Sequence, residues 1–401
     1  MGAAASSVHK MNANKSSHMS RSMSRHLEIG QSRAIDGELA KNRVDNAGLL
    51  MVLGTGNSGK STILKQLSFL SASQNGENNF QKLAIETAEL RIQLHRNIIR
   101  GCLDGIRTII DQSYHSGYLT DTILLLGTPH DAAQLAHDLL FEATSLDDVC
   151  EVNEDVLHIK DLCKSFWKDT CDLFEKGNLK TEVQLAYLLE DSVFDRLNKP
   201  DYKASHDDWL QVRARTSGVI ERLFCIDGNY LRVVDVGGQK NERRKWIHHF
   251  DKAVAVLFMV SLGEINESLL EDSRINNFLD ARDCFREICE CPFLTKSMFT
   301  IIFNKMDLFD TQVVNDSRTT STLQRVFPEE EAGLSSIHGD STAIRKLISE
   351  KFVKVFHDSR VSDYEPPVIF TCATDTSTVT TILKQCIIHM QTAALKENAF
   401  M

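Results

Sequence analysis

Five short apolar runs, rich in residues that favour β-strands, are spread widely along the chain. Helix-length segments separate them, and each run is apolar almost throughout instead of alternating apolar with polar residues. Strands of this kind are typical of parallel sheets that helices cover on both faces. The pattern therefore predicts an α/β fold with a mostly parallel sheet. The predicted strands are LLMVL (Leu49–Leu53), LRVVDV (Leu231–Val236), AVLFMV (Ala255–Val260), FTIIF (Phe299–Phe303) and VIFT (Val368–Thr371).

The long interval between the first two runs has a different pattern. Apolar residues recur there at the spacing of an amphipathic helix, as in VLHIKDLCKSFWKDTCDLF (Val156–Phe174). The same spacing relates Ile99, Cys102, Leu103, Ile106, Ile109 and Ile110. We therefore expect an all-helical insertion over residues 75–205, which divides one α/β domain into residues 46–74 and 206–401.

Residues 1–31 form a tail rich in Ser, Met and Asn, a composition typical of disorder. MGAAAS at its start fits the pattern for myristoylation of Gly2. Because one myristoyl chain binds a membrane only marginally, a second signal is needed. Residues 1–27 are basic and contain no acidic residue, so they could supply it at an anionic inner membrane surface. A short polar helix is expected over residues 32–45.

Composition narrows the function classes. The chain has 401 residues with 45 Lys and Arg against 55 Asp and Glu, and its net charge of -10 argues against nucleic acid as a partner. Its longest apolar stretch, AVAVLFMVSL (Ala253–Leu262), is too short to span a bilayer. The 10 cysteines lack metal-binding spacing, which favours reduced thiols packed in the interior of a cytosolic protein.

GTGNSGKS (Gly54–Ser61) follows the first predicted strand and precedes a helical pattern. This is the spacing of a P-loop, in which glycines let backbone N–H groups surround phosphate oxygens at the positive end of a helix. Lys60 would reach the outer phosphates, and the Ser61 hydroxyl would bind Mg²⁺. An isolated glycine turn is the alternative, but the strand before and the helix after favour nucleotide binding. The predicted contacts here are Gly56, Asn57, Ser58, Gly59, Lys60, Ser61 and Thr62.

DVGGQ (Asp235–Gln239) ends the second predicted strand. Asp235 is placed to hold Mg²⁺ through water, and Gly238 permits close backbone approach to a terminal phosphate. Gln239 could orient an attacking water. A strand-ending glycine turn without chemistry is the alternative.

RARTSG (Arg213–Gly218) lies upstream of this motif. It contains a candidate cation, Arg213, and a second candidate metal-binding hydroxyl, Thr216. By themselves these residues are typical of a surface loop, so their interpretation depends on the other motifs.

NKMD (Asn304–Asp307) follows the strand FTIIF, and loops at the carboxyl ends of parallel strands line the ligand crevice. The Asp307 carboxylate can accept hydrogen bonds from guanine N1–H and from the exocyclic amine. Adenine has an acceptor at N1 and would leave that carboxylate unpaired, so an adenine-specific ATPase is the less favoured alternative. Asn304, Lys305 and Asp307 are therefore predicted to bind the base, although the tetrapeptide alone is also typical of a polar turn.

The order of the motifs resembles that in alpha subunits of heterotrimeric G proteins. The shared motifs are GTGNSGKST, RARTSG, DVGGQKNERRKW, NKMD and TCATDT (Thr371–Thr376). FWKD (Phe166–Asp169) is also similar to that family, and the resemblance extends from about Ser32 to Met401. It implies a Ras-like P-loop domain, interrupted by a helical domain, that binds GTP or GDP with Mg²⁺.

The resemblance also implies a GTP-hydrolysing switch. Arg213 would be a built-in arginine finger and Gln239 would position water. RARTSG and DVGGQKNERRKW would be switch segments that the terminal phosphate orders. Further nucleotide contacts are implied for Leu210, Gln211, Val212, Cys372, Ala373 and Thr374.

The implied partners are those of the family. A beta-gamma dimer would cover the second switch and the N-terminal helix, and a membrane receptor would engage the C-terminal helix. Effectors and GTPase-accelerating regulators are implied as well, at the cytoplasmic face of the plasma membrane. The alternative is a nucleotide-bound scaffold with little GTP turnover, but a scaffold has no need of Arg213, Gln239 and Thr216.

Several positions depart from the family pattern. Asn57 replaces a Glu that can pair with the finger arginine, so we expect a looser hold on GDP and slower GDP release after Asn57→Glu. Gln211 replaces an Arg. Val183 and Gln184 stand where the family often has an Asp–Ser pair that faces the nucleotide, so at these positions the chain departs from the pattern that the resemblance implies for closure between the domains.

Other departures affect the second switch and the two ends. Asp280 replaces a Glu that would receive Arg243, although a shorter acid can still pair after a small shift. No cysteine precedes Cys102, so the tail offers no second acylation site. Asn398 and Ala399 stand where the family has a glycine and, in some members, a cysteine that a bacterial toxin modifies, so that modification is not expected.

Overall fold

The computed structural model describes two parts of the chain, one built around a sheet and one helical. The described residues are 47–74, 90–105, 167–168, 183–199, 201–213, 218–226, 229–269, 272, 274–330, 334–360, 364–382, 384–385 and 388. The predicted tail and N-terminal helix, Gly2, Thr216 and the departures at Asn398 and Ala399 lie outside them.

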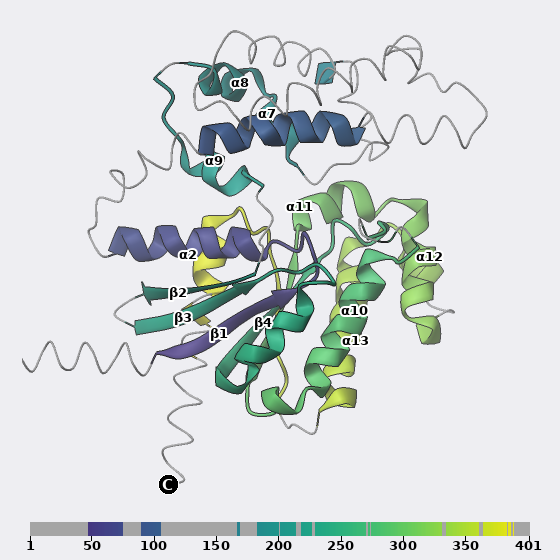
Figure 1. Ribbon diagram of the computed structural model, residues 1–401. Coiled ribbons are helices and arrows are strands. Elements are labelled where there is room, and N and C mark those ends of the chain that lie inside the picture. Colours follow the sequence, from purple (N-terminus) through teal and green to yellow (C-terminus); the bar gives the residue numbers. More distant parts are fainter. Residues whose placement is uncertain are drawn as a thin grey trace, which may run out of the picture.

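A six-stranded sheet lies at the centre of the larger part (Figure 1). Its strand order is β2-β3-β1-β4-β5-β6, and every neighbouring pair is parallel except β2 with β3. The strands are β1 (Gly48–Gly54), β2 (Val219–Ile226), β3 (Asn229–Val236), β4 (Ala253–Ser261), β5 (Met298–Asn304) and β6 (Val368–Phe370). All five predicted runs are strands of this sheet, so the predicted α/β class with a mostly parallel sheet is confirmed.

β2 is the strand that the hydrophobic pattern did not predict. Its sequence, VIERLFCI, carries two charged residues, and its first half is largely exposed. It lies at the edge of the sheet and pairs antiparallel with β3, from Val219↔Val236 to Ile226↔Asn229. An edge strand that water reaches does not need the continuous apolar sequence of the central strands, so the search for apolar runs passed over it.

Helices cover both faces of the sheet (Figure 1). α2 (Lys60–Gln74) and the helical residues 376–382 pack on one face, in a cluster with side chains of β1, β3 and β4. α10 (Asn277–Glu290) and α13 (Ser341–Ser359) pack on the other face, where phenylalanine rings meet. Phe285, for example, lies 4.8 Å from Phe258 and 5.5 Å from Phe352 between ring centroids. Burial from both sides explains why the central strands are apolar throughout.

Shorter elements connect these helices and strands. They are η1 (Arg243–Lys252), η2 (Pro292–Leu294), α11 (Met306–Leu308), η3 (Phe309–Val313), α12 (Ser317–Val326), η4 (Pro328–Glu330) and η5 (Leu334–Ile337). The N-cap residues directly before α10, α12 and α13 are Asn276, Asp316 and Asp340, whose side chains accept hydrogen bonds from backbone N–H groups of the first turn.

The described part of the predicted insertion is helical and has its own apolar cluster. It contains a helix over residues 90–105, α7 (Leu185–Leu188) and α8 (Asp191–Leu197). α9 (His206–Gln211) follows, and Val212 beyond it packs in the same cluster. Val183, one of the departures, is buried in this cluster. The boundaries 75 and 205 stay a prediction, because the residues around 75 and most of 106–182 lie outside the described part.

Candidate functional site

The loop between β1 and α2 has a backbone that two glycines make possible. Gly54 has φ +142° and Gly59 has φ +99°, values that side chains rarely adopt. A Cβ on Gly59 would overlap the Asn304 side-chain amide, and a Cβ on Gly54 would overlap the Met259 carbonyl oxygen. The loop therefore lies directly against β4 and the end of β5, as a P-loop at the carboxyl ends of parallel strands should.

Lys60 lies inside this loop, at the start of α2. Its side chain is buried, and Nζ donates a hydrogen bond to the Thr55 carbonyl at 2.6 Å. Burial lowers the pKa of Lys60 to about 8, against the opposing effect of the Asp235 carboxylate. A phosphate group in the loop would favour the charged ammonium and raise this pKa again.

The DVGGQ turn at the end of β3 lies beside the P-loop. A Cβ on Gly238 would overlap Lys60 Nζ and would lie 2.6 Å from the Thr55 carbonyl oxygen. A Cβ on Gly56 would lie 3.8 Å from Cγ of Gln239. The P-loop and the DVGGQ turn, which are far apart in the sequence, therefore lie in contact in the folded chain.

The donor set at the start of α2 fits Mg²⁺. Ser61 Oγ donates a hydrogen bond to Oδ2 of Asp235 at 3.1 Å, so a hydroxyl and a carboxylate already lie side by side. Both are hard oxygen donors of the kind that Mg²⁺ prefers, and one or two carboxylates with waters are typical of its nucleotide sites. In the part of the chain that the structure describes, no three His, Cys, Asp or Glu side chains gather, so a zinc-type cluster is not found there.

The candidate arginine is held through its backbone. Asn97, on the helix over residues 90–105, accepts a hydrogen bond from the Arg213 N–H at 2.6 Å and donates one to the Arg213 carbonyl at 2.8 Å. Gln93 donates to the same carbonyl at 3.0 Å. Lys65 of α2 donates to the preceding carbonyl, of Val212, at 2.6 Å. These contacts place Arg213 between the helical part and the P-loop helix.

Positive charge gathers at this junction. Burial lowers the pKa of Lys65 to about 8, and the charge of Arg213 adds to that lowering. Arg213 also contributes to the lowered pKa of Lys60. Three cations in mutual range are unfavourable by themselves and would be stabilised by an anion such as a polyphosphate.

A buried polar network fixes α9, the helix directly before the candidate arginine. The Asp208 carboxylate accepts hydrogen bonds from the Arg196 guanidinium, from the Tyr187 and Tyr202 hydroxyls at 2.8 Å each, and from the Ser205 N–H at 2.8 Å. Burial alone raises the pKa of Asp208, but these hydrogen bonds, that from Arg196 first, lower it to about 2. Ser205 in turn accepts from the Asp208 N–H, which completes a capping box. Leu210 and Gln211 form the end of α9.

Asn304 joins the NKMD loop to the other loops. Its amide donates to the Ser58 carbonyl at 2.8 Å and accepts from the Ala373 N–H at 2.8 Å. Cys372 Sγ lies 3.0 Å from Oγ1 of Thr374, and burial raises the pKa of the Cys372 thiol, with a smaller contribution from Asp307. The structure thus brings NKMD, the P-loop and residues 372–374 together.

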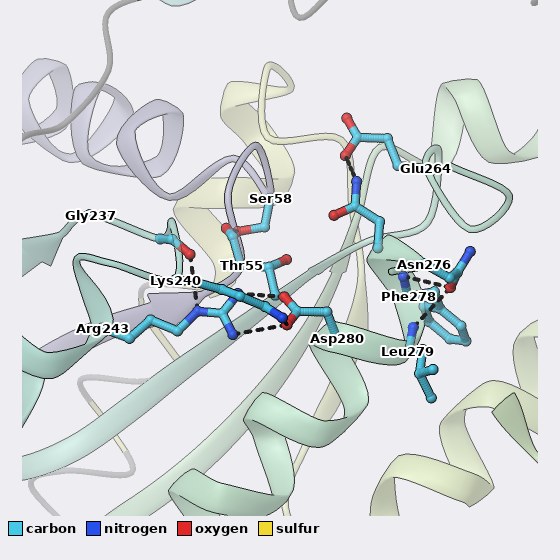
Figure 2. A network of polar contacts seen from close by, with 12 residues as sticks. Thr55, Ser58, Gly237, Lys240, Arg243, Glu264, Asn276, Phe278, Leu279 and Asp280 are labelled. Carbon is cyan, nitrogen blue, oxygen red and sulfur yellow. Dashed lines mark hydrogen bonds and ion pairs between the residues drawn. The ribbon is translucent and has the colours of Figure 1, made fainter. Parts of the chain in front are cut away.

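The expected pair between Arg243 and Asp280 is present. The Arg243 guanidinium donates two hydrogen bonds to the Asp280 carboxylate, and Lys240 lies 3.4 Å from the same group (Figure 2). Arg243 also donates to the Gly238 carbonyl at 3.2 Å. The shorter acid therefore forms the pair that the motif predicted.

Four residues that contact this site were not predicted from the sequence. Gln93 and Asn97 lie on a helix more than 100 residues from Arg213, and Lys65 is a half-buried residue of α2. Glu264 accepts hydrogen bonds from Asn57 and from Lys305, the latter at 2.6 Å. None of them belongs to a motif, so only the folded contacts identify them.

Comparison with known proteins agrees with the geometry. A family model described as the G-protein alpha subunit matches residues 30–390. Guanine nucleotide-binding protein alpha-7 subunits of Caenorhabditis briggsae and Caenorhabditis elegans are each 30% identical to this chain, over 363 and 364 residues, which cover 88% of this chain and 92% of each relative. The alpha-15 subunit of Caenorhabditis elegans is 29% identical over 358 residues, with 88% and 91% covered. The similarity therefore spans most of the length of both chains.

Proposed function

Because this chain belongs to the family of G-protein alpha subunits, and so to the guanine nucleotide-binding signalling proteins, we propose that it is a GTPase switch. It cycles between GDP and GTP states and relays signals from a membrane receptor to effectors. The observation that carries this proposal is the meeting of three motif loops, through Asn304 with Ser58 and through Gly238 with Lys60.

Different loops bind the two ends of GTP, the phosphates and the base. The P-loop N–H groups and Lys60 bind the phosphates, since backbone donors at the start of a helix and an ammonium group both favour an anion. Asp307 accepts from guanine N1–H and the exocyclic amine, while residues 372–374 pack around the base. A carboxylate acceptor that guanine pairs with and adenine leaves unpaired is the physical basis of the selectivity.

Hydrolysis depends on Gln239 and Arg213. Gln239, whose Cγ faces the P-loop, orients the attacking water in line with the terminal phosphate. Arg213 stabilises the charge that develops on the phosphate oxygens. In alpha subunits and related GTPases such an arginine accelerates hydrolysis by about 10³- to 10⁵-fold.

Mg²⁺ is the cofactor of the family, and the residues present suit it. Ser61 and Thr216 would hold it directly and Asp235 through water. When bound, it neutralises charge on the outer two phosphates.

Partners and location follow the same proposal. A beta-gamma dimer, a receptor, effectors and GTPase-accelerating regulators act on the switch segments and on the two ends of the chain. The protein acts as a peripheral protein at the cytoplasmic face of the plasma membrane, with myristate on Gly2 and the basic tail as its two membrane signals. No helix in the described residues is both long enough and apolar enough to cross a bilayer.

Single-turnover hydrolysis of GTP by the purified full chain tests the proposal. We expect the native chain to hydrolyse bound GTP and Gln239→Leu to lower that rate by about 100-fold, because the attacking water is no longer oriented. GDP affinity should stay within about threefold. Gln324→Leu on α12, outside the loops, is the matched control and should leave the rate unchanged.

Two results would contradict the proposal in different ways. Tight GTP binding without hydrolysis by the native chain would identify the nucleotide-bound scaffold instead. Equal competition by ATP and GTP would remove the assigned role of Asp307.

A further inference from the structure

Glu264 joins the two loops that hold opposite ends of the nucleotide. It lies three residues after β4, and its Oε1 accepts hydrogen bonds from the Asn57 side chain in the P-loop and from Lys305 in NKMD, the latter at 2.6 Å. Its Oε2 accepts from Asn277, the first residue of α10, at 3.1 Å. The side chains of Glu264 and Lys305 are only 16% and 17% exposed. One oriented carboxylate therefore bonds to both nucleotide loops.

The two residues that share Oε1 are also the two with unusual backbones. Asn57 has φ 59° and Lys305 has φ 64°, and in the described residues no other non-glycine residue has a positive φ. Such a conformation is strained for a residue with a side chain and persists only where the surroundings maintain it. Both residues bring N–H donors to Glu264, so an acceptor between them is needed to hold the two loops in these conformations.

We propose that Glu264 is a positioning residue that slows GDP release by holding the P-loop and the guanine loop together through Asn57 and Lys305. The inference rests on the proposed function, since it concerns the release of the same nucleotide. GDP can leave only when the loops around its phosphates and its base loosen, and a shared carboxylate makes them loosen together.

This contact reverses the expectation for position 57. From the sequence we expected Asn57→Glu to restore a pair with Arg213 and so to slow GDP release. In the structure a Glu at position 57 would bring a second carboxylate against that of Glu264, and two close carboxylates repel. Asn57→Glu is therefore expected to speed release as long as Glu264 is present.

The experiment measures dissociation of a fluorescent GDP analogue from the purified full chain after addition of excess GDP. Glu264→Gln should release it about tenfold faster, because the hydrogen bonds from Asn57 and Lys305 lose the negative charge of their acceptor. Glu267→Gln, three residues further along the same segment and 3.9 Å from Arg318, is the matched control and should stay within about twofold of the native rate. An unchanged rate in Glu264→Gln overturns the inference.

A double-mutant cycle separates the charge effect from folding damage. Asn57→Gln and Asn57→Glu have side chains of equal size and the same backbone penalty, so their ratio isolates the charge. With Glu264 present, Asn57→Glu should release GDP about tenfold faster than Asn57→Gln; in Glu264→Gln the ratio should fall to about one. Equal ratios in the two backgrounds overturn the inference, and so does slower release from Asn57→Glu even if Glu264→Gln does not fold. Failure of the native chain to bind GDP or GTP would overturn the proposed function itself.

Discussion

The loops at the carboxyl ends of the strands and the Arg213 segment meet at one site, but different interactions position them. Glycine backbones and hydrogen bonds between neighbouring loops, such as Asn304 with Ser58, fix the strand-end loops on a sheet that is buried on both faces. The Arg213 segment depends on side chains of separate helices, above all Asn97. It follows that nucleotide binding and hydrolysis should be separable by mutation.

Gly59→Ala should have the largest effect, because it acts on the strand-end loops. Gly59 has φ +99°, and the new methyl group would overlap the Asn304 amide, so both the loop conformation and its contact with NKMD are lost. We expect GDP affinity, measured by calorimetry, to fall on the order of 100-fold. Gly339→Ala, between η5 and α13, is the control: its φ is +78° and a Cβ there would lie 3.5 Å from Oδ1 of Asn315, so the same kind of backbone strain acts away from the nucleotide loops and GDP affinity should change little. Native affinity in Gly59→Ala would contradict this account of the loop.

Asn97→Ala should have the next largest effect, a loss of hydrolysis rate that leaves nucleotide affinity nearly unchanged. It removes two hydrogen bonds to the Arg213 backbone, and a displacement of about 1 Å at a catalytic group can cost about 100-fold in rate. We expect single-turnover GTP hydrolysis to slow by about 10- to 100-fold while GDP affinity stays within threefold. Asn198→Ala, in the same helical part and with its side chain 3.4 Å from His95, is the control. Equal losses of affinity and rate would show that the two regions are not separable.

The smallest effect concerns stability of the helical part in acid. Hydrogen bonds lower the pKa of Asp208 to about 2 from an ordinary value of 3.8, so its ionised form stabilises the folded state above about pH 4. That contribution, about 2 kcal/mol, is lost as pH falls from about 4 to about 2. Trp209 lies beside Asp208, and Trp167 packs in the same helical cluster. Tryptophan fluorescence in a Trp246→Phe background therefore reports unfolding of this part.

Asp208→Asn should remove most of that acid dependence. Asp207→Asn, exposed on the same helix, is the control and should leave it intact. Identical acid profiles for the native chain and Asp208→Asn would contradict the assigned role of this carboxylate.

Much of the fold could be predicted because its signals are local. A strand buried on both faces must be apolar throughout, which identified β1, β3, β4, β5 and β6. A loop that wraps a phosphate needs glycines at set positions, which identified the P-loop. β2 was not predicted because it lies at the edge of the sheet, where no continuous apolar sequence is required.

The supporting residues of the site could not be predicted in this way. Asn97 and Glu264 are single polar residues without a motif, and each acts on partners that lie far away in the sequence. Asn97 bonds to Arg213, 116 residues later, and Glu264 bonds to Asn57, 207 residues earlier. Their roles depend on which backbones the fold brings beside them.

By itself, the amino-acid sequence determined the class of fold, the phosphate- and guanine-binding motifs and the resemblance to alpha subunits. Each of these depends on the properties of short segments: apolar runs, glycine positions and the order of motifs. Only the tertiary structure decided what fixes Arg213 and what position 57 contacts. Those answers depend on hydrogen bonds and charges between distant segments, whose free energies exist only once folding has brought the partners within a few ångströms.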